Sequence, residues 1–193
     1  GNGASSRDYG FLHKNTSGAK FEIVSGYKGT AEVRLAQLAT LSTASGVMGM
    51  AAGQAIDMGH VGKSMGLGAL QEMHARKTGD LIVAAVRLGY QSKPGLGRVH
   101  QQGLEAFANA LGLAYQVIDD ILDVESTSDV LGKTSGKDAL NNKPTMVSLM
   151  GLAEARQLLD KLRQESLGAI ARLEPSRRQP LETLVELITN RTS

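Results

Sequence analysis

Apolar residues along this chain recur mainly at three- and four-residue intervals, which is the period of a helix that buries one face. No run alternates apolar and polar residues for long enough to build a sheet. The pattern predicts helices over residues 30–58, 70–89, 98–124, 146–173 and 181–189. The predicted fold class is therefore all-α, with these helices packed as a bundle.

Glycines and prolines mark the predicted breaks between these helices. The predicted loops are residues 59–68, 92–97 and 125–143. Pro144 suits the first turn of the helix that follows, and Pro175 and Pro180 are expected to separate the last two helices. Residues 1–18 are rich in Gly, Ser and Asn, which predicts a flexible lead-in to the domain.

The composition narrows the classes of partner and site. With 193 residues, 41% of them hydrophobic, the chain can bury a core of its own, and the absence of cysteine excludes disulfides and thiolate metal sites. Lys and Arg number 21 against 19 Asp and Glu, and aromatic residues make up only 4%, which argues against a nucleic-acid partner. No apolar run approaches the roughly 18 residues of a membrane span or forms a signal segment, so we expect a cytoplasmic protein.

The most informative run is YQVIDDILD, at residues 115–123. In a helix with about 100° per residue, Gln116 and three aspartates fall within an arc of about 100°. The three aspartates are Asp119, Asp120 and Asp123. Apolar residues occupy the rest of the circumference, so the run predicts an acidic stripe bordered by apolar surface.

Two interpretations of this stripe compete. The ordinary one is the solvated face of an amphipathic helix. However, no Lys or Arg lies between Arg98 and Lys133 to offset three like charges, and two of them about 4 Å apart repel by about 4 kcal/mol at an effective dielectric near 20. Oxygen donors without neighbouring His or Cys favour magnesium, which commonly shares its coordination with phosphate oxygens. The stripe therefore favours Mg²⁺ and a phosphorylated substrate.

Three further segments carry candidate chemistry. Lys133, Lys137 and Lys143 lie in the polar stretch after the aspartates, where they serve either solubility or the binding of a diphosphate. A nucleotide-binding P-loop is excluded there, because Thr127 stands where that motif requires its first glycine. In HARKTG, Gly79 interrupts a helix beside Lys77, which predicts either a bend or simply close packing.

The HARKTG segment also contains a histidine, and the third segment, around residues 46–57, contains a row of small residues. His74 alone is more simply a histidine satisfied by partners than a catalytic base. Gly46, Gly49 and Gly53 predict a close helix approach, next to which Gln54 and Asp57 share one helix face.

Taken together and in order, these segments resemble the polyprenyl diphosphate synthase family, in particular its bacterial farnesyl diphosphate synthase branch. The matching segments are GQAID, KTG, YQVIDDILD and LGKTSGKDALNNKPT. The resemblance extends from about residue 30 to the end and implies an isoprenoid synthase helical bundle. It also implies a magnesium-dependent condensation of isopentenyl diphosphate with an allylic diphosphate, dimethylallyl or geranyl, to give farnesyl diphosphate, carried out by a homodimer.

The resemblance also implies roles for single residues. Those that would hold magnesium are Asp119, Asp120 and Asp123, with Asp119 the most direct ligand. Those that would bind the diphosphate are Lys77, Lys133 and Lys143. Thr78, the Lys77 carbonyl and Gln116 would turn oxygen dipoles toward the allylic cation, while Gln54 and Asp57 would support the wall of the site.

The chain departs from the family pattern in one respect. The family has a first aspartate-rich motif followed by an arginine pair, upstream of GQAID, whereas here the only adjacent aspartates are Asp119 and Asp120, and the only adjacent arginines are Arg177 and Arg178. Residues 19–193 are thus expected to be the C-terminal portion of such a domain, without its N-terminal helices or the positions that set product length.

Two alternatives to an active prenyltransferase follow. One is a truncated, catalytically impaired or noncatalytic fragment or subunit of such a synthase, because the first aspartate-rich motif is absent. The other is a di-iron helical bundle, which also uses inward carboxylates. That bundle requires Glu three residues before His, and none of the four histidines has it.

Overall fold

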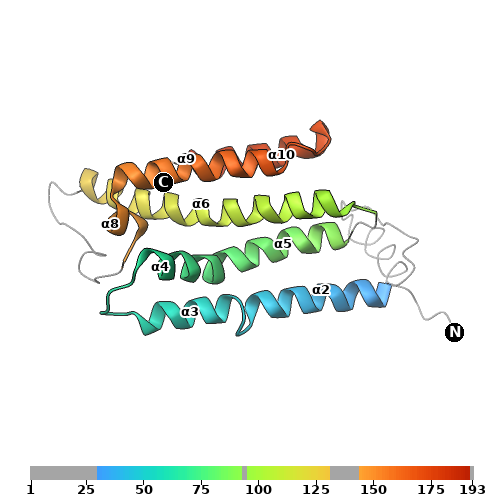
Figure 1. Cartoon of the computed structure of the whole chain (residues 1–193), viewed down its shortest axis with the longest axis horizontal. Coiled ribbons are helices and arrows are strands. Elements are labelled where there is room, and N and C mark those ends of the chain that lie inside the picture. The colour runs from blue at the N-terminus through green and yellow to red at the C-terminus, as the bar shows by residue number, and fades with distance from the viewer. Residues whose placement is uncertain (1–29, 93–94, 131–143, 192–193) are drawn as a thin grey trace, which may run out of the picture. The chain divides into compact units, whose positions relative to one another are not determined.

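The structure is a computed structural model that describes residues 30–92, 95–130 and 144–191 (Figure 1). Its elements are α2 (Thr30–Ser45), α3 (Met50–Gly59), α4 (Leu67–His74), the π-helix η1 (Ala75–Gly79), α5 (Asp80–Gln91), α6 (Arg98–Val130), α8 (Met146–Met150), α9 (Leu152–Ala169) and α10 (Pro175–Thr189). These residues contain no strand, so the predicted all-α fold class is confirmed. None of these helices has both the length and the apolar character needed to cross a membrane.

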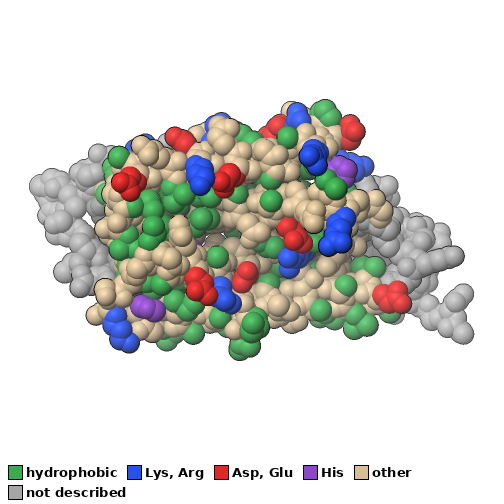
Figure 2. Space-filling view, in the orientation of Figure 1, with side chains coloured by type: hydrophobic (Ala, Val, Ile, Leu, Met, Phe, Trp, Pro, Cys, Tyr) green, Lys and Arg blue, Asp and Glu red, His purple; other side chains and the backbone are tan. Residues whose placement is uncertain are grey.

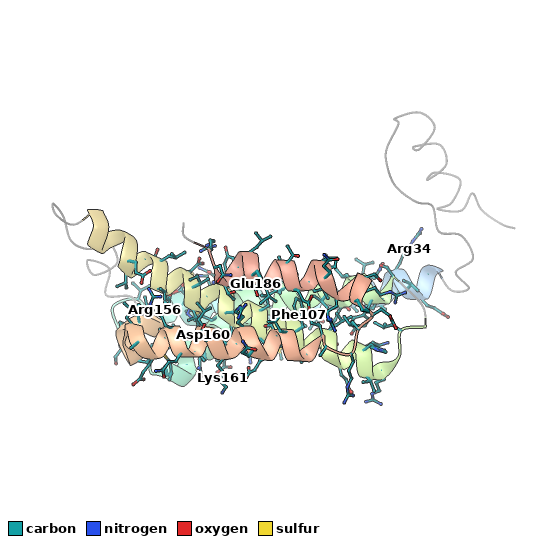
Figure 3. All side chains as sticks on the ribbon, turned by 90° about the horizontal axis from the view of Figure 1, so that it is seen from above. Arg34, Phe107, Arg156, Asp160, Lys161 and Glu186 are labelled. Carbon is teal, nitrogen blue, oxygen red and sulfur yellow. The ribbon has the colours of Figure 1, made fainter. Side chains whose placement is uncertain are left out.

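Helix α6 is the central element of the compact unit that begins at Leu35. It packs against α9 and α10 on one side and against α5 and η1 on the other, while α3 packs on η1 (Figure 1). Phe107 of α6, which is 1% exposed, lies between these helices (Figure 3). Burial of one such side chain stabilises the fold by roughly 1.5–3 kcal/mol, so α6 anchors the core on both sides.

The apolar core has two parts that lie along α6. One surrounds Phe107 and Leu111 and includes Val83 of α5 and Val185 of α10. The other surrounds Val117 and Ile121 and reaches α4, α8 and α9. This second part lies under the aspartate-bearing end of α6, so the acidic run rests on packed side chains.

Two predicted helices are each broken in two by glycines. Residues 30–58 are interrupted between α2 and α3, where a side chain on Gly49 would meet the carbonyl oxygen of Ala44 at 2.1 Å. Residues 146–173 are interrupted between α8 and α9 at Gly151, whose φ of 88° is a conformation that other residues rarely adopt. The predictions of single helices there were wrong, because glycine adopts a turn about as readily as a helix and the sequence alone does not decide between them.

Three other predicted boundaries were also wrong. Helix α6 continues to Val130, since the first Gly or Pro after Gly112 is Gly132, and so the first six residues of the predicted loop are helical. Pro144 precedes the N-cap Thr145 and is not in the first turn of α8. Pro180 lies inside α10, where it is exposed and water can satisfy the carbonyl group that its missing N–H leaves.

Helix α2 is held much more loosely than α6. Among its described side chains only Ala44 is buried. Helix α2 is joined to the end of α5 by hydrogen bonds from Gln37 to Ser92 and between Thr40 and Gln91. Figure 2 shows hydrophobic side chains protruding along the edge formed by α2 and α3. They include Leu35, Leu38, Val47, Met48 and Met58, each more than 60% exposed.

Candidate functional site

A cleft of about 250 Å³ lies where α3, α4, η1, α6 and the start of α8 meet. Its ionisable and amide side chains are Asp57, His60, His74, Lys77, Gln116, Asp120 and Asp123. Five of the predicted residues, from three separate segments of the sequence, therefore share one cavity: Asp57, Lys77, and Gln116, Asp120 and Asp123 of α6. The volume is slightly below the roughly 300 Å³ at which small-molecule pockets usually begin, which suits a small charged group.

The α3 wall of the cleft depends on a close approach of two backbones. A side chain on Gly53 would lie 2.3 Å from the amide nitrogen of Lys77, so glycine is required there, as the small-residue pattern predicts. One turn later on α3, Asp57 Oδ2 accepts a hydrogen bond of 2.5 Å from Lys77 Nζ. The ammonium group is thereby held at the cleft and does not extend freely into solvent.

The predicted irregularity beside Gly79 is confirmed. Residues 75–79 form a π-helix between α4 and α5, a local change of hydrogen bonding that is frequent at functional sites. Gly112 of α6 packs closely on this turn, because a side chain there would lie 3.1 Å from the Cα atom of Gly79. The π-helix thus carries Lys77 and is clamped between α3 and α6.

Two neighbouring aspartates of α6 meet different surroundings. Asp120 lines the cleft, and its Oδ2 accepts a 2.6 Å hydrogen bond from the amide of Met146 at the start of α8. Asp119 is not among the described lining residues and forms an ion pair with Arg191, just beyond α10. The guanidinium of Arg191 also lies 5.1 Å from the centre of the Tyr115 ring. The cation that offsets Asp119 therefore comes from the distant C-terminal segment.

His74 does not have the satisfied environment expected of it. The residue is 7% exposed, and among the described residues neither ring nitrogen has a hydrogen-bond partner. Burial lowers the pKa of His74 below its ordinary value of 6.5, opposed by Gln116, with Lys77 lowering it further and Asp57 raising it. The imidazole is therefore neutral at neutral pH and has one N–H donor and one acceptor.

The remaining predicted residues lie away from the cleft or beyond the described chain. Gln54 is exposed on α3, Thr78 is half-buried in η1, and neither is among the described lining residues. Lys133 and Lys143 lie outside the described residues. The sequence did not indicate Arg191, since 72 residues separate it from Asp119. By contrast, His74 lies three residues before Lys77, and this spacing alone indicates that the two side chains share one helix face.

The donor set suits a hard cation shared with a ligand. In the described part of the chain, no three or more His, Asp or Glu side chains converge closely enough to hold a metal ion by themselves. Magnesium does not need such a cage, because it is usually bound by one or two carboxylates together with water and phosphate oxygens. Asp120 and Asp123, which line the cleft together with Lys77, are carboxylates of the type that such a set requires.

Comparison with known proteins identifies the family. The model of the polyprenyl synthetase family matches residues 19–183. The chain is 44% identical over 135 residues to farnesyl diphosphate synthase of Escherichia coli, a match that covers 68% of this chain and 45% of the relative. It is 40% identical over 162 residues to farnesyl diphosphate synthase of Micrococcus luteus, covering 83% of this chain and 55% of the relative.

The fold agrees with that of a solved relative. The geranyltransferase of Helicobacter pylori, crystallised with magnesium and isoprenyl diphosphate, superposes with a TM-score of 0.66 at 28% identity, covering 94% of this chain and 56% of the other. The chain thus spans about half the length of each of these relatives. The match over most of this chain, with the shared helical fold, shows that the protein belongs to the polyprenyl synthetase family.

Proposed function

We propose that this protein is a magnesium-dependent prenyltransferase that condenses isopentenyl diphosphate with dimethylallyl or geranyl diphosphate to give farnesyl diphosphate. The observation that carries the proposal is the convergence in one cleft of Lys77 from η1 with Gln116, Asp120 and Asp123 from α6. The names of the relatives from Escherichia coli and Micrococcus luteus support the same reaction.

The residues of the cleft, and those expected near it, would have different roles in the reaction. Asp120 and Asp123 would hold magnesium, joined by Asp119 when it leaves Arg191, and the ion would offset the charge that develops on the departing diphosphate. Lys77 would add a second positive charge, which is already positioned by Asp57. Lys133 and Lys143 would bind the same diphosphate, and Gln116 and Thr78 would turn oxygen dipoles toward the allylic cation.

A direct assay tests this function. The protein is incubated with isopentenyl and geranyl diphosphates and Mg²⁺, and diphosphate release and product length are measured by mass spectrometry. Turnover to a fifteen-carbon product is expected, with a loss of about 100-fold or more in Asp120→Asn, because a carboxylate that acts in the transition state is removed. The absence of turnover at high protein concentration, with a full-length bacterial synthase active in parallel, would contradict independent activity.

The alternative is a noncatalytic or impaired fragment or subunit of such a synthase. It is favoured by the sequence, which contains one aspartate-rich motif where the family has two. A single acidic wall should bind magnesium diphosphate weakly, because an octahedral ion then lacks some of its carboxylates. Calorimetry that shows tight, magnesium-dependent binding of diphosphate would argue against this alternative.

The proposal includes a homodimer. The exposed apolar side chains of α2 and α3 support it, because contiguous apolar surface of this kind commonly marks a protein interface (Figure 2). Sedimentation should show a dimer of the wild-type chain, and Leu38→Lys should shift it toward the monomer. A monomeric wild-type protein would rule out the homodimer without affecting the assignment of the cleft.

A further inference from the structure

The buried imidazole of His74 has no assigned role in the proposed reaction. Its two ring nitrogens are buried, and no described residue forms a hydrogen bond with either. A buried polar group left without a partner costs about 1–3 kcal/mol, and folded proteins keep few of them. An apolar side chain would fill the same space without that cost, so the ring nitrogens themselves need an explanation.

Four polar groups face this ring from three elements. Asp57 comes from α3, Lys77 from η1, and Gln116 and Asp120 from α6. Lys77 cannot accept a hydrogen bond and is engaged by Asp57. The nearest carboxylate oxygen is Asp120 Oδ2, at 3.8 Å from His74 Nε2, while the contact of Gln116 with the ring falls short of hydrogen-bond geometry.

The same oxygen of Asp120 already accepts a hydrogen bond from another element. The amide of Met146 donates to Oδ2 at 2.6 Å, and the capping box formed by Thr145 and Ser148 holds that amide in place. A movement of about 1 Å would bring His74 Nε2 within hydrogen-bond distance of the same atom. Both contacts are to Oδ2.

We propose that His74 is a positioning residue whose Nε2–H donates to Asp120 Oδ2 and, with the Met146 amide, fixes the orientation of the carboxylate that faces the cleft. The inference deepens the proposed function, on which it depends for the role of Asp120 as a magnesium ligand. The opposite tautomer would direct a lone pair of Nε2 at a carboxylate oxygen, which is repulsive. Hydrogen-bonded groups behind a metal ligand commonly contribute 10–100-fold to metal affinity, so an effect of about that size is expected.

Two substitutions separate positioning from simple filling of space. His74→Gln keeps an N–H donor, and His74→Phe keeps a flat aromatic ring, slightly larger than imidazole, but removes the donor. Binding of Mn²⁺ with inorganic diphosphate is measured by electron paramagnetic resonance beside thermal unfolding, with His100→Phe at the far end of α6 as the control. Positioning predicts that His74→Phe weakens Mn²⁺ binding about 10–100-fold without lowering the unfolding midpoint, and that His74→Gln stays within about threefold of wild type. Unchanged binding in His74→Phe would overturn the inference.

A measurement without metal decides the hydrogen bond independently. Nitrogen-15 NMR of the histidine rings, with the His74 signals assigned by their loss in His74→Gln, should show the Nε2–H tautomer. These signals should move in Asp120→Asn and stay in place in Gln116→Leu. An Nδ1–H tautomer, or signals that respond only to Gln116, would refute the proposed contact. If the tautomer is as expected but wild type binds no Mn²⁺, the proposed magnesium site fails while the His74 contact stands.

Discussion

The two sides of α6 near its aspartates are built differently. On the cleft side, Asp120 meets His74 of α4 and the Met146 amide of α8, and the same cleft is bounded by the close backbone packing of Gly53 on Lys77. On the α10 side, the described residues offer Asp119 one ion-pair partner, Arg191, two residues beyond the end of α10. Adjacent residues of a helix point about 100° apart, so one carboxylate serves a packed site while its neighbour depends on a terminal contact.

This difference predicts that changes on the cleft side cost more free energy than changes on the α10 side. Backbone atoms cannot move aside as the end of a long side chain can, and partly buried charges are less screened than exposed ones. The four predictions below run from the largest effect to the smallest.

The largest effect is expected from Gly53→Ala. The new methyl group would lie 2.3 Å from the backbone nitrogen of Lys77, so α3 must move away from η1. We expect the free energy of unfolding, measured in urea, to fall by about 3 kcal/mol. Gly59→Ala, on the same helix with nothing within 4 Å, should be neutral or slightly stabilising. Equal stability of the two variants would mean that the close approach is not required.

The ion pair between Asp57 and Lys77 should give the next largest effect. Its carboxylate is 15% exposed and its ammonium 35%, so removal of one partner leaves a charge that is only partly hydrated. A double-mutant cycle with Asp57→Asn and Lys77→Met should give a coupling free energy of about 1–2 kcal/mol.

The matched control for this cycle is the pair of Arg178 and Glu182 on α10, which are one helical turn apart and whose carboxylate is 41% exposed against 15% for Asp57. Its coupling should stay near about 0.5 kcal/mol. Equal couplings for the two pairs would remove the energetic distinction between the cleft side and the α10 side.

The fold could be predicted largely from periodicity, because each long helix buries one apolar stripe. The position of α6 and the interruption at Gly79 follow from local sequence alone. The breaks at Gly49 and Gly151 could not be predicted, because glycine tolerates both helix and turn.

The candidate site was predictable to the extent that helix geometry alone determines it. Gln116, Asp120 and Asp123 lie together because their spacing places them on one face, and they line the cleft as a group. Asp119 lies at the edge of that arc, where the neighbouring helix decides its surroundings. Its partner Arg191 follows a separate helix, so no local pattern could have linked the two.

Glu105 is a carboxylate of α6 that lies outside the cleft and joins α6 to α5, so its substitution measures a contribution to stability alone. It accepts hydrogen bonds from Arg87 and from Tyr90, and these two groups hold the pKa of Glu105 below its ordinary value of 4.5. Because the pKa is lower in the folded state, the stabilisation is complete above pH 4.5 and is lost as the pH falls below it. Glu105→Gln should therefore cost about 1 kcal/mol at neutral pH, and the difference from wild type should shrink in acid.

Urea unfolding at neutral pH and below pH 4.5 checks this prediction. Glu165→Gln is the control, since Glu165 makes only an exposed contact with Lys161 on α9 and should change stability by less than about 0.5 kcal/mol. Addition of Mg²⁺ and diphosphate should leave the effect of Glu105→Gln unchanged, unlike any change made in the cleft. A difference between wild type and Glu105→Gln that grows in acid would contradict the assigned direction.

The smallest effect on stability is expected from Arg191→Gln. Its effect on metal binding should be opposite in sign to that of His74→Phe. The ion pair with Asp119 and the contact with Tyr115 are partly exposed, so their loss should cost about 0.5 kcal/mol. If Asp119 is a magnesium ligand, the guanidinium competes with the ion, and its removal should tighten Mn²⁺ binding about twofold. Arg177→Gln on the exposed face of α10 should change neither quantity. Tighter binding in Arg191→Gln beside weaker binding in His74→Phe would show that the two sides of α6 act on metal affinity in opposite directions, whereas weaker binding in both would mean that Arg191 supports the site and does not compete for it.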